Sequence, residues 1–89
     1  MARFEILIKR SAAKEIEAIS RKKDRQRIVR KIHELAEDPR PPGCQKLSGR
    51  DRYRIRQGSY RIVYAIENDR LIVNVVKVGH RSKVYRGPL

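Results

Sequence analysis

A proline-rich segment in the middle of the chain limits most strongly the folds that the chain can adopt. Pro39, Pro41 and Pro42 are followed by Gly43, and proline both removes a backbone donor and clashes inside a helix. Helical structure therefore ends before this segment. Apolar side chains are spaced as in helices before the segment and mostly alternate as in strands after it, so it separates a helical half from a strand half.

The half before the prolines predicts a short strand and then two helices. Residues 4–8 alternate imperfectly between apolar and polar side chains, which is typical of a strand. Ser11 and Asp24 stand where each can cap a helix, because their side-chain oxygens accept free backbone N–H groups. We therefore expect a helical hairpin. Its apolar residues at helical spacing are Ala12, Ile16 and Ile19, then Ile28, Ile32, Leu35 and Ala36.

The half after the prolines predicts three strands. Residues 53–56 and 60–66 alternate, and residues 71–78 are apolar but for two positions. A strand that is apolar on both faces needs cover on both faces or neighbours on both edges. We expect this last strand to lie centrally, beside the first strand, with the Tyr53 strand at an edge.

These elements together predict an α+β fold. We expect a four-stranded, mainly antiparallel sheet with the N-terminal helical hairpin packed on one face. A chain of 89 residues is short enough to form one core, so we expect residues 1–89 to form a single domain.

Gly58 and Ser59 provide a two-residue turn that fixes the register of the strands around it. Arg56 then lies opposite Arg61, on the same face as Arg54 and away from the tyrosines and isoleucines expected under the helices. Two arginines paired across strands repel each other by roughly 0.2–1 kcal/mol. Folding gains nothing from such a pair, whereas guanidinium groups match phosphate oxygens with two hydrogen bonds. A phosphate site explains the pair, and an ordinary solvated basic face is the alternative.

Further candidates lie around this pair. Gly79 permits a sharp exit from the sheet. Histidine is the residue type suited to moving protons near neutral pH, so His80 is either a proton-transfer candidate or an ordinary histidine at a strand end. Tyr85 can stack on a base or hold its hydroxyl near a phosphate, or it packs at the edge of the core. The phosphate-binding set also includes Lys46, Arg50 and Arg52. The basic residues of the hairpin form a solvated face that can also contact an RNA backbone: Arg21, Lys22, Lys23, Arg25, Arg27, Arg30 and Lys31.

The charge balance limits the class of partner. Lys and Arg total 23 against 10 Asp and Glu, a net charge of +13, so we expect the binding partner to be a polyanion, an acidic protein or both.

No apolar run approaches the roughly 18 residues of a membrane span. The N-terminus also lacks the apolar stretch of a signal peptide, so we expect a cytoplasmic protein with no membrane partner. One Cys and two His show no metal-binding spacing, and we expect no metal and no cofactor.

Five short motifs follow one another along the chain: Lys46-Leu47-Ser48-Gly49, Tyr53-Arg54-Ile55-Arg56, Tyr60-Arg61-Ile62-Val63-Tyr64, Val78-Gly79-His80-Arg81 and Val84-Tyr85. In their order and spacing they resemble the RelE toxins of the RelE/ParE superfamily, and the resemblance runs from Phe4 to Tyr85. It implies the toxin of a type II toxin–antitoxin system that cuts mRNA in the ribosomal A site. The implied cut is an attack by the ribose 2′-OH on the adjacent phosphate, which leaves a 2′,3′-cyclic phosphate.

The resemblance also implies roles for individual residues. Arg61 matches the arginine that stabilises the transition state, and Arg81 matches the arginine assigned to leaving-group or charge stabilisation. Tyr85 matches the tyrosine that positions or activates the nucleophile. Two positions of the Tyr-basic-Ile-basic strand hold arginine where a familiar RelE has lysine. Because arginine effectively cannot lose its proton, His80 becomes the better acid–base candidate.

Two other functions stay open on the sequence. A ParE-like toxin has the same fold and poisons DNA gyrase without enzymatic activity, but it would not need Arg61, Arg81 and Tyr85 together. A plain RNA-binding or ribosome-binding module needs only the positive charge. For the toxin, the resemblance implies three partners: a RelB-like antitoxin with an acidic toxin-binding segment, the ribosome with its A-site mRNA, and operator DNA reached only through the antitoxin.

Overall fold

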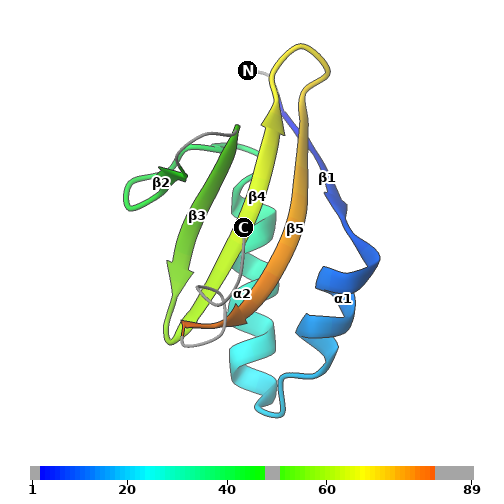
Figure 1. The fold of residues 1–89 in the computed structure, drawn as a ribbon, viewed down its shortest axis with the longest axis vertical. Coiled ribbons are helices and arrows are strands. Elements are labelled where there is room, and N and C mark those ends of the chain that lie inside the picture. Colours follow the sequence, from blue (N-terminus) through cyan, green and yellow to red (C-terminus); the bar gives the residue numbers. More distant parts are fainter. Residues whose placement is uncertain (1–2, 48–50, 82–89) are drawn as a thin grey trace.

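One sheet with two helices packed against it makes up the computed structural model, which describes residues 3–47 and 51–81 (Figure 1). The strands lie in the order β1-β5-β4-β3-β2, and α2 lies behind the sheet in Figure 1. In chain order the elements are β1 (Glu5–Ile8), α1 (Arg10–Glu17), α2 (Lys22–Glu34), β2 (Gln45–Leu47), β3 (Arg52–Gln57), β4 (Tyr60–Glu67) and β5 (Ile72–His80).

The sheet confirms the α+β class and the central position of β5, and it corrects the number of strands. β5 has β4 antiparallel on one side and β1 parallel on the other. The expectation of four strands is wrong, because β2 pairs with β3 and adds a fifth. The Tyr53 strand, β3, therefore does not lie at an edge. β2 has three residues of which only Leu47 is apolar, so it has no alternation that a sequence pattern could reveal.

The helical hairpin is confirmed, but its helices begin without the predicted caps. Lys9 and Arg21 occupy the N-cap positions, and neither side chain makes a capping hydrogen bond. Ser11 and Asp24 lie within the first turns instead. Backbone pairing sets the start of α1, because the N–H of Lys9 still donates to the Val75 carbonyl oxygen at 2.9 Å. In the described part of the chain, neither helix is long and apolar enough to cross a membrane.

A bulge in β5 changes which of its side chains face the core. The pairing of β4 with β5 shifts between Val63 and Tyr64, and a bulge inserts one residue into the alternation. Val73 and Val75 face the core two residues apart, whereas the next core residue, Val78, follows after three. Every residue after the bulge therefore lies on the face opposite to the one that simple alternation predicts.

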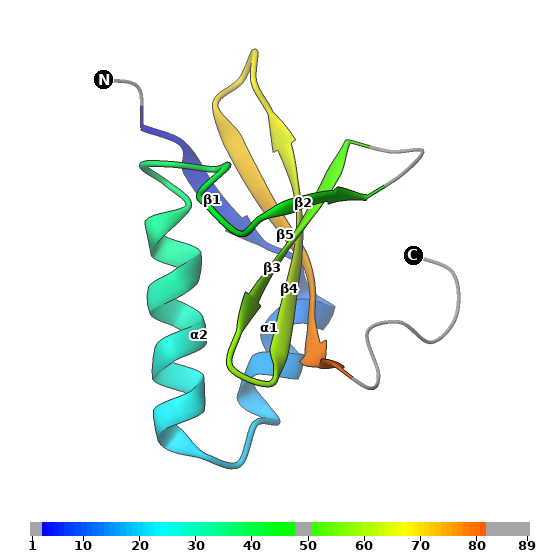
Figure 2. The same ribbon diagram turned by 90° about the vertical axis from the view of Figure 1, so that its left-hand side faces the viewer.

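The apolar core fills the space between the helices and the sheet. As predicted, the isoleucines and tyrosines of β3 and β4 pack in it or against it. The residues that alternate with them therefore lie on the other face of the sheet, the face away from α2 in Figure 2. The buried members are Ala12, Ile16, Ile19, Ile28, Ile32, Leu35, Ile55, Ile62, Tyr64, Ile66, Val73, Val75 and Val78.

Candidate phosphate-binding site

The hairpin of β3 and β4 brings three arginines to the face of the sheet that points away from the helices. Gly58 begins its turn with φ of 62°, a left-handed conformation that glycine adopts readily and that a type II′ turn requires at this position. Arg56 pairs with Arg61 across the strands, as the sequence predicts. Arg54 lies two residues before Arg56 and therefore on the same face.

Two of these guanidinium groups are buried although they carry a charge. Arg54 and Arg61 are 8% and 7% exposed, whereas Arg56 is exposed. Burial, followed by the charges of Arg56, Arg54 and Arg81, lowers the pKa of the Arg61 guanidinium. Burial and then Arg56 lower the pKa of Arg54. We call these four residues together the arginine face: Arg54, Arg56, Arg61 and Arg81.

The short strand β2 helps to orient one member of the arginine face. Gln45 lies opposite Arg54 in the ladder between β2 and β3. Its side-chain oxygen accepts a hydrogen bond from Nη2 of Arg54, which restricts the rotation of that guanidinium group. The sequence analysis missed Gln45, because nothing in the sequence indicates the strand that carries it.

Gly79 lies directly opposite Arg61 on β5. It does not end the sheet as predicted, since β5 continues to His80 and the N–H of Arg81 donates to the Ser59 carbonyl oxygen at 2.8 Å. A glycine in a strand often marks a place where a ligand approaches the backbone. Because Gly79 has no side chain, β5 places no side chain opposite Arg61 on the arginine face.

The structure separates His80 from the arginine face. His80 pairs with Tyr60, and their rings meet edge to face with centroids 5.8 Å apart. Opposed residues share a face of the sheet, and Tyr60 packs against the core. His80 therefore lies on the helix side, whereas Arg61 and Gly79 lie on the other side. This geometry favours the alternative of an ordinary histidine at a strand end over an acid–base role beside Arg61.

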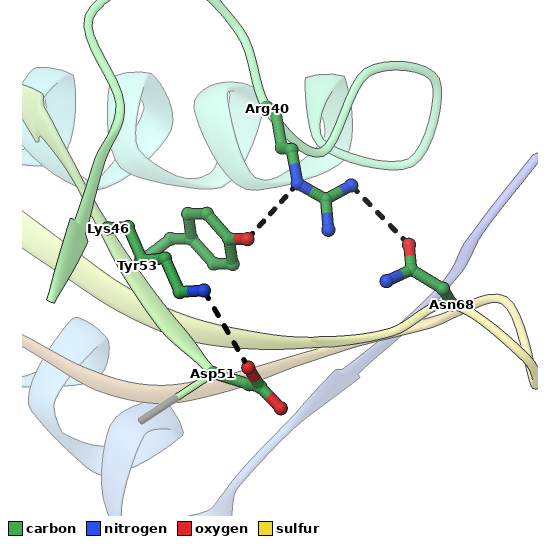
Figure 3. A network of polar contacts seen from close by, with 5 residues as sticks. All are labelled: Arg40, Lys46, Asp51, Tyr53 and Asn68. Carbon is green, nitrogen blue, oxygen red and sulfur yellow. Dashed lines mark hydrogen bonds and ion pairs between the residues drawn. The ribbon is translucent and has the colours of Figure 1, made fainter. Parts of the chain in front are cut away.

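Lys46 also lies apart from the arginine face. It pairs with Tyr53, whose ring packs against the core, and its ammonium group lies 4.0 Å from the Asp51 carboxylate. Figure 3 shows this pair next to Arg40, whose Nε donates to the Tyr53 hydroxyl at 3.2 Å and whose Nη1 donates to the Asn68 side-chain oxygen at 3.4 Å. The surroundings of Lys46 are those of a surface ion pair.

The other predicted site residues are placed only in part. Arg52 is the first residue of β3 and lies on the same face as Arg54, two residues before it. Arg50 and Tyr85 lie outside the described residues. Among the described residues there is no group of three or more His, Cys, Asp or Glu side chains that could hold a metal ion. What the arginine face itself offers is fixed positive charge, which binds phosphate and stabilises negative charge that develops on it.

Comparison with known proteins finds sequence similarity over most of the chain. A sequence profile described as "ParE toxin of type II toxin-antitoxin system, parDE" matches residues 6–85. The chain is 28% identical over 83 residues to a protein of Escherichia coli described as RelE-like toxin, a match that covers 91% of this chain and 86% of that protein.

Solved structures are similar over almost the whole chain. A chain of the archaeal RelE–RelB complex from Pyrococcus horikoshii matches with a TM-score of 0.81 and 24% identity, over 93% of this chain and 99% of that one. This match shows a shared fold. A chain of the intact E. coli RelBE toxin–antitoxin complex matches with a TM-score of 0.74 and 32% identity, over 89% of this chain and 96% of that one.

Proposed function

The chain belongs to the RelE/ParE superfamily of toxins from type II toxin–antitoxin systems, and we propose that it is a ribosome-dependent endoribonuclease that cuts mRNA. The arginine face is the observation that carries this proposal. Arg61 is buried beside the charges of three other arginines, and such a concentration of fixed positive charge suits an anionic ligand. A phosphate that is being cut gains negative charge, which fixed guanidinium groups stabilise.

The proposed reaction uses the nucleophile of the RNA itself. The ribose 2′-OH loses its proton and forms a bond to the adjacent phosphorus, while the bond from phosphorus to the 5′ oxygen breaks. The products are a 2′,3′-cyclic phosphate and a free 5′-OH. In this reaction Arg61 neutralises the non-bridging oxygens and Arg81 stabilises the leaving oxygen. By the family resemblance, Tyr85 positions or activates the 2′-OH. The rigid strands hold the charged groups in place before the reaction starts.

The first test of this proposal is a translation reaction with purified ribosomes and one defined mRNA. We expect the protein to cut this mRNA at positions set by the A-site codon and to leave the same mRNA intact when ribosomes are absent. The readout is primer extension across the message. Intact mRNA on translating ribosomes would contradict the proposed activity.

The gyrase inhibitor is the second candidate function, because the matching sequence profile carries the ParE description. It is tested with the same protein in a DNA supercoiling assay. Blocked supercoiling without any mRNA cleavage would establish this alternative and replace the ribonuclease. Cleavage with normal supercoiling would exclude it.

Substitution of His80 tests how the proton is moved. His80→Ala is expected to lower the cleavage rate less than tenfold, because the ring lies on the helix side of the sheet. A residue that transfers the proton would contribute about 10²–10⁴-fold. Arg54→Ala, which removes a buried charge of the arginine face, is expected to cost more than His80→Ala. The single-turnover rate and its pH profile measure both effects, and the reverse order would restore His80 as the acid–base group.

An antitoxin is the proposed protein partner. Among the similar structures, one from E. coli and one from Pyrococcus horikoshii are complexes of RelE with RelB. The net charge of +13 favours an antitoxin whose toxin-binding segment is acidic and folds when it binds. Contact with operator DNA would then pass through the antitoxin rather than through this chain.

A further inference from the structure

A row of basic side chains on α2 lies beside the open edge of β3. β2 pairs with β3 only as far as Arg54, and within residues 3–47 and 51–81 no strand pairs with residues 55–57 on that side. Figure 2 shows α2 running alongside this part of β3. The basic side chains are spaced by three and four residues, which places them on one face of α2. We call them the α2 basic row: Arg27, Arg30 and Lys31.

Two hollows connect the α2 basic row with the arginine face. The first, of about 330 Å³, has Lys31 on one wall and Arg54 and Arg56 on the other. The second, of about 250 Å³, is lined by the whole α2 basic row together with Glu34 and Gln57. Because Lys31 lines both hollows, positive charge continues without a break from the arginine face, over the edge of β3, to α2.

We propose that these residues form a track that binds the sugar–phosphate backbone of RNA on one side of the phosphate that is cut. The cationic residues of the track are Arg54, Arg56, Lys31, Arg30 and Arg27. The inference rests on the proposed function, since it adds a second contact with the same partner. The track has five cationic side chains and one carboxylate among the residues that line it. That carboxylate belongs to Glu34 and lies 3.5 Å from Nζ of Lys31. Such an excess of positive charge matches a chain with one negative charge per nucleotide.

An acidic protein segment fits the track less well than RNA does. Protein interfaces depend on apolar side chains at their centre, and the track offers few of them because Ile55 is almost fully buried. An apolar hollow of about 620 Å³ lies between the two helices, on the other side of Arg30, with Ile16 and the exposed Val29 among its lining residues. A protein partner would find its apolar contacts there.

The test compares two triple variants with the same loss of charge. One replaces the α2 basic row (Arg27→Gln, Arg30→Gln and Lys31→Gln), and the control replaces two arginines and one lysine that line neither hollow and are exposed: Arg10→Gln, Lys14→Gln and Arg70→Gln. The probe is a fluorescent single-stranded RNA of twelve nucleotides with 2′-O-methyl riboses, which cannot attack its own phosphates. Fluorescence anisotropy gives its Kd at several salt concentrations, and thermal unfolding confirms that both variants fold.

Loss of three phosphate contacts is expected to reduce the slope of log Kd against log salt by about 2, because each contact with single-stranded RNA contributes about 0.7. The control variant is expected to change this slope by less than about 0.5. Glu34→Gln should act in the opposite sense and tighten binding of the same RNA about two- to fivefold, because it removes the one negative charge in the track. Damage to the fold could not tighten binding.

Two outcomes would overturn the inference. Equal slopes for the two triple variants would mean that only net charge matters and that the track is not a site. A loss of affinity for a polyglutamate peptide with unchanged RNA binding would assign the track to an acidic protein. The translation reaction keeps the proposed function separate. If the wild-type protein does not cut mRNA but the α2 variant alone has a reduced salt slope, the RNA track stands and the proposed ribonuclease does not. If the protein cuts mRNA but the two triple variants have equal slopes, the ribonuclease stands and the RNA track does not.

Discussion

Arg61→Met is expected to abolish mRNA cleavage on ribosomes while the protein stays folded. Arg61 is the most enclosed charge of the arginine face, at 7% exposure, and the residue opposite it on β5 is Gly79, which has no side chain. Removal of one fixed hydrogen-bond donor from a site that stabilises developing negative charge costs about 10²–10³-fold in rate. A full positive charge is removed here, so we expect a loss at or above the upper end of this range.

The same substitution should not destabilise the fold. Burial and the neighbouring charges lower the pKa of Arg61, so the charged form is less favourable in the folded than in the unfolded chain. At neutral pH the group is charged in both states, and this unfavourable contribution is therefore fully present. Methionine is unbranched and occupies much of the same space without the charge. Arg61 also makes interactions of its own that the substitution removes. The loss of the unfavourable charge offsets them, so the free energy of unfolding, measured with urea, should change by less than about 1 kcal/mol.

The control for this prediction is Arg70→Met. Arg70 is exposed and pairs with Glu67 at 3.5 Å on the surface, a contact that contributes little, so neither cleavage nor stability should change. A loss of several kcal/mol in stability on Arg61→Met, with a parallel loss of cleavage, would show instead that Arg61 serves the fold. The combination of lost cleavage and retained stability distinguishes a functional charge from a structural one.

The arginine face could be predicted from the sequence because only local rules define it. A two-residue turn at Gly58 and Ser59 sets the register, and the alternation of a strand then assigns Arg56 and Arg61 to one face. Both the turn and the pairing are found in the structure. The burial of Arg61 could not be predicted, because it depends on how neighbouring strands pack around the guanidinium group.

Features that depend on distant parts of the chain were missed or assigned wrongly. Simple alternation along β5 places Gly79 with Val75, but the bulge reverses the alternation, so that His80 joins the core face and Gly79 joins Arg61. No local signal in an almost wholly apolar strand indicates a bulge. β2 likewise forms only because β3 offers it a partner, and Gln45 acquires its role from that pairing.

Tyr64 is expected to be the residue on which the stability of the fold depends most. It is completely buried, its ring stacks on Tyr53 with centroids 5.9 Å apart, and its hydroxyl donates to the Pro39 carbonyl oxygen at 2.7 Å. It thereby fastens the proline-rich segment to the sheet. Tyr64→Ala removes a buried aromatic side chain and should cost about 3–5 kcal/mol of unfolding free energy, which is enough to unfold a domain of this size at 37 °C.

Tyr64→Phe separates the hydroxyl from the ring. It should cost about 1–3 kcal/mol, because the buried Pro39 carbonyl oxygen loses its donor. Tyr53→Phe is the matched control, since the Tyr53 hydroxyl accepts its hydrogen bond from Arg40 at an exposed site. Its cost should stay below about 1 kcal/mol. Equal costs for the two substitutions, measured by urea unfolding, would show that the contact with Pro39 does not hold the segment.

The pH dependence of this difference gives an independent check of the Tyr64 hydroxyl. Burial, followed by the nearby Cys44, raises the pKa of Tyr64 above its ordinary value of about 10. Below pH 10 the hydroxyl keeps its proton in both states, so its stabilising contribution is complete. Above pH 10 the unfolded chain ionises first, and the contribution falls by about 1.4 kcal/mol per pH unit. The difference in unfolding free energy between the wild-type protein and Tyr64→Phe should therefore be constant from pH 7 to 9 and shrink from pH 10 to 11. A difference that stays constant to pH 11 would mean that this hydroxyl ionises as readily in the folded protein as in the unfolded chain.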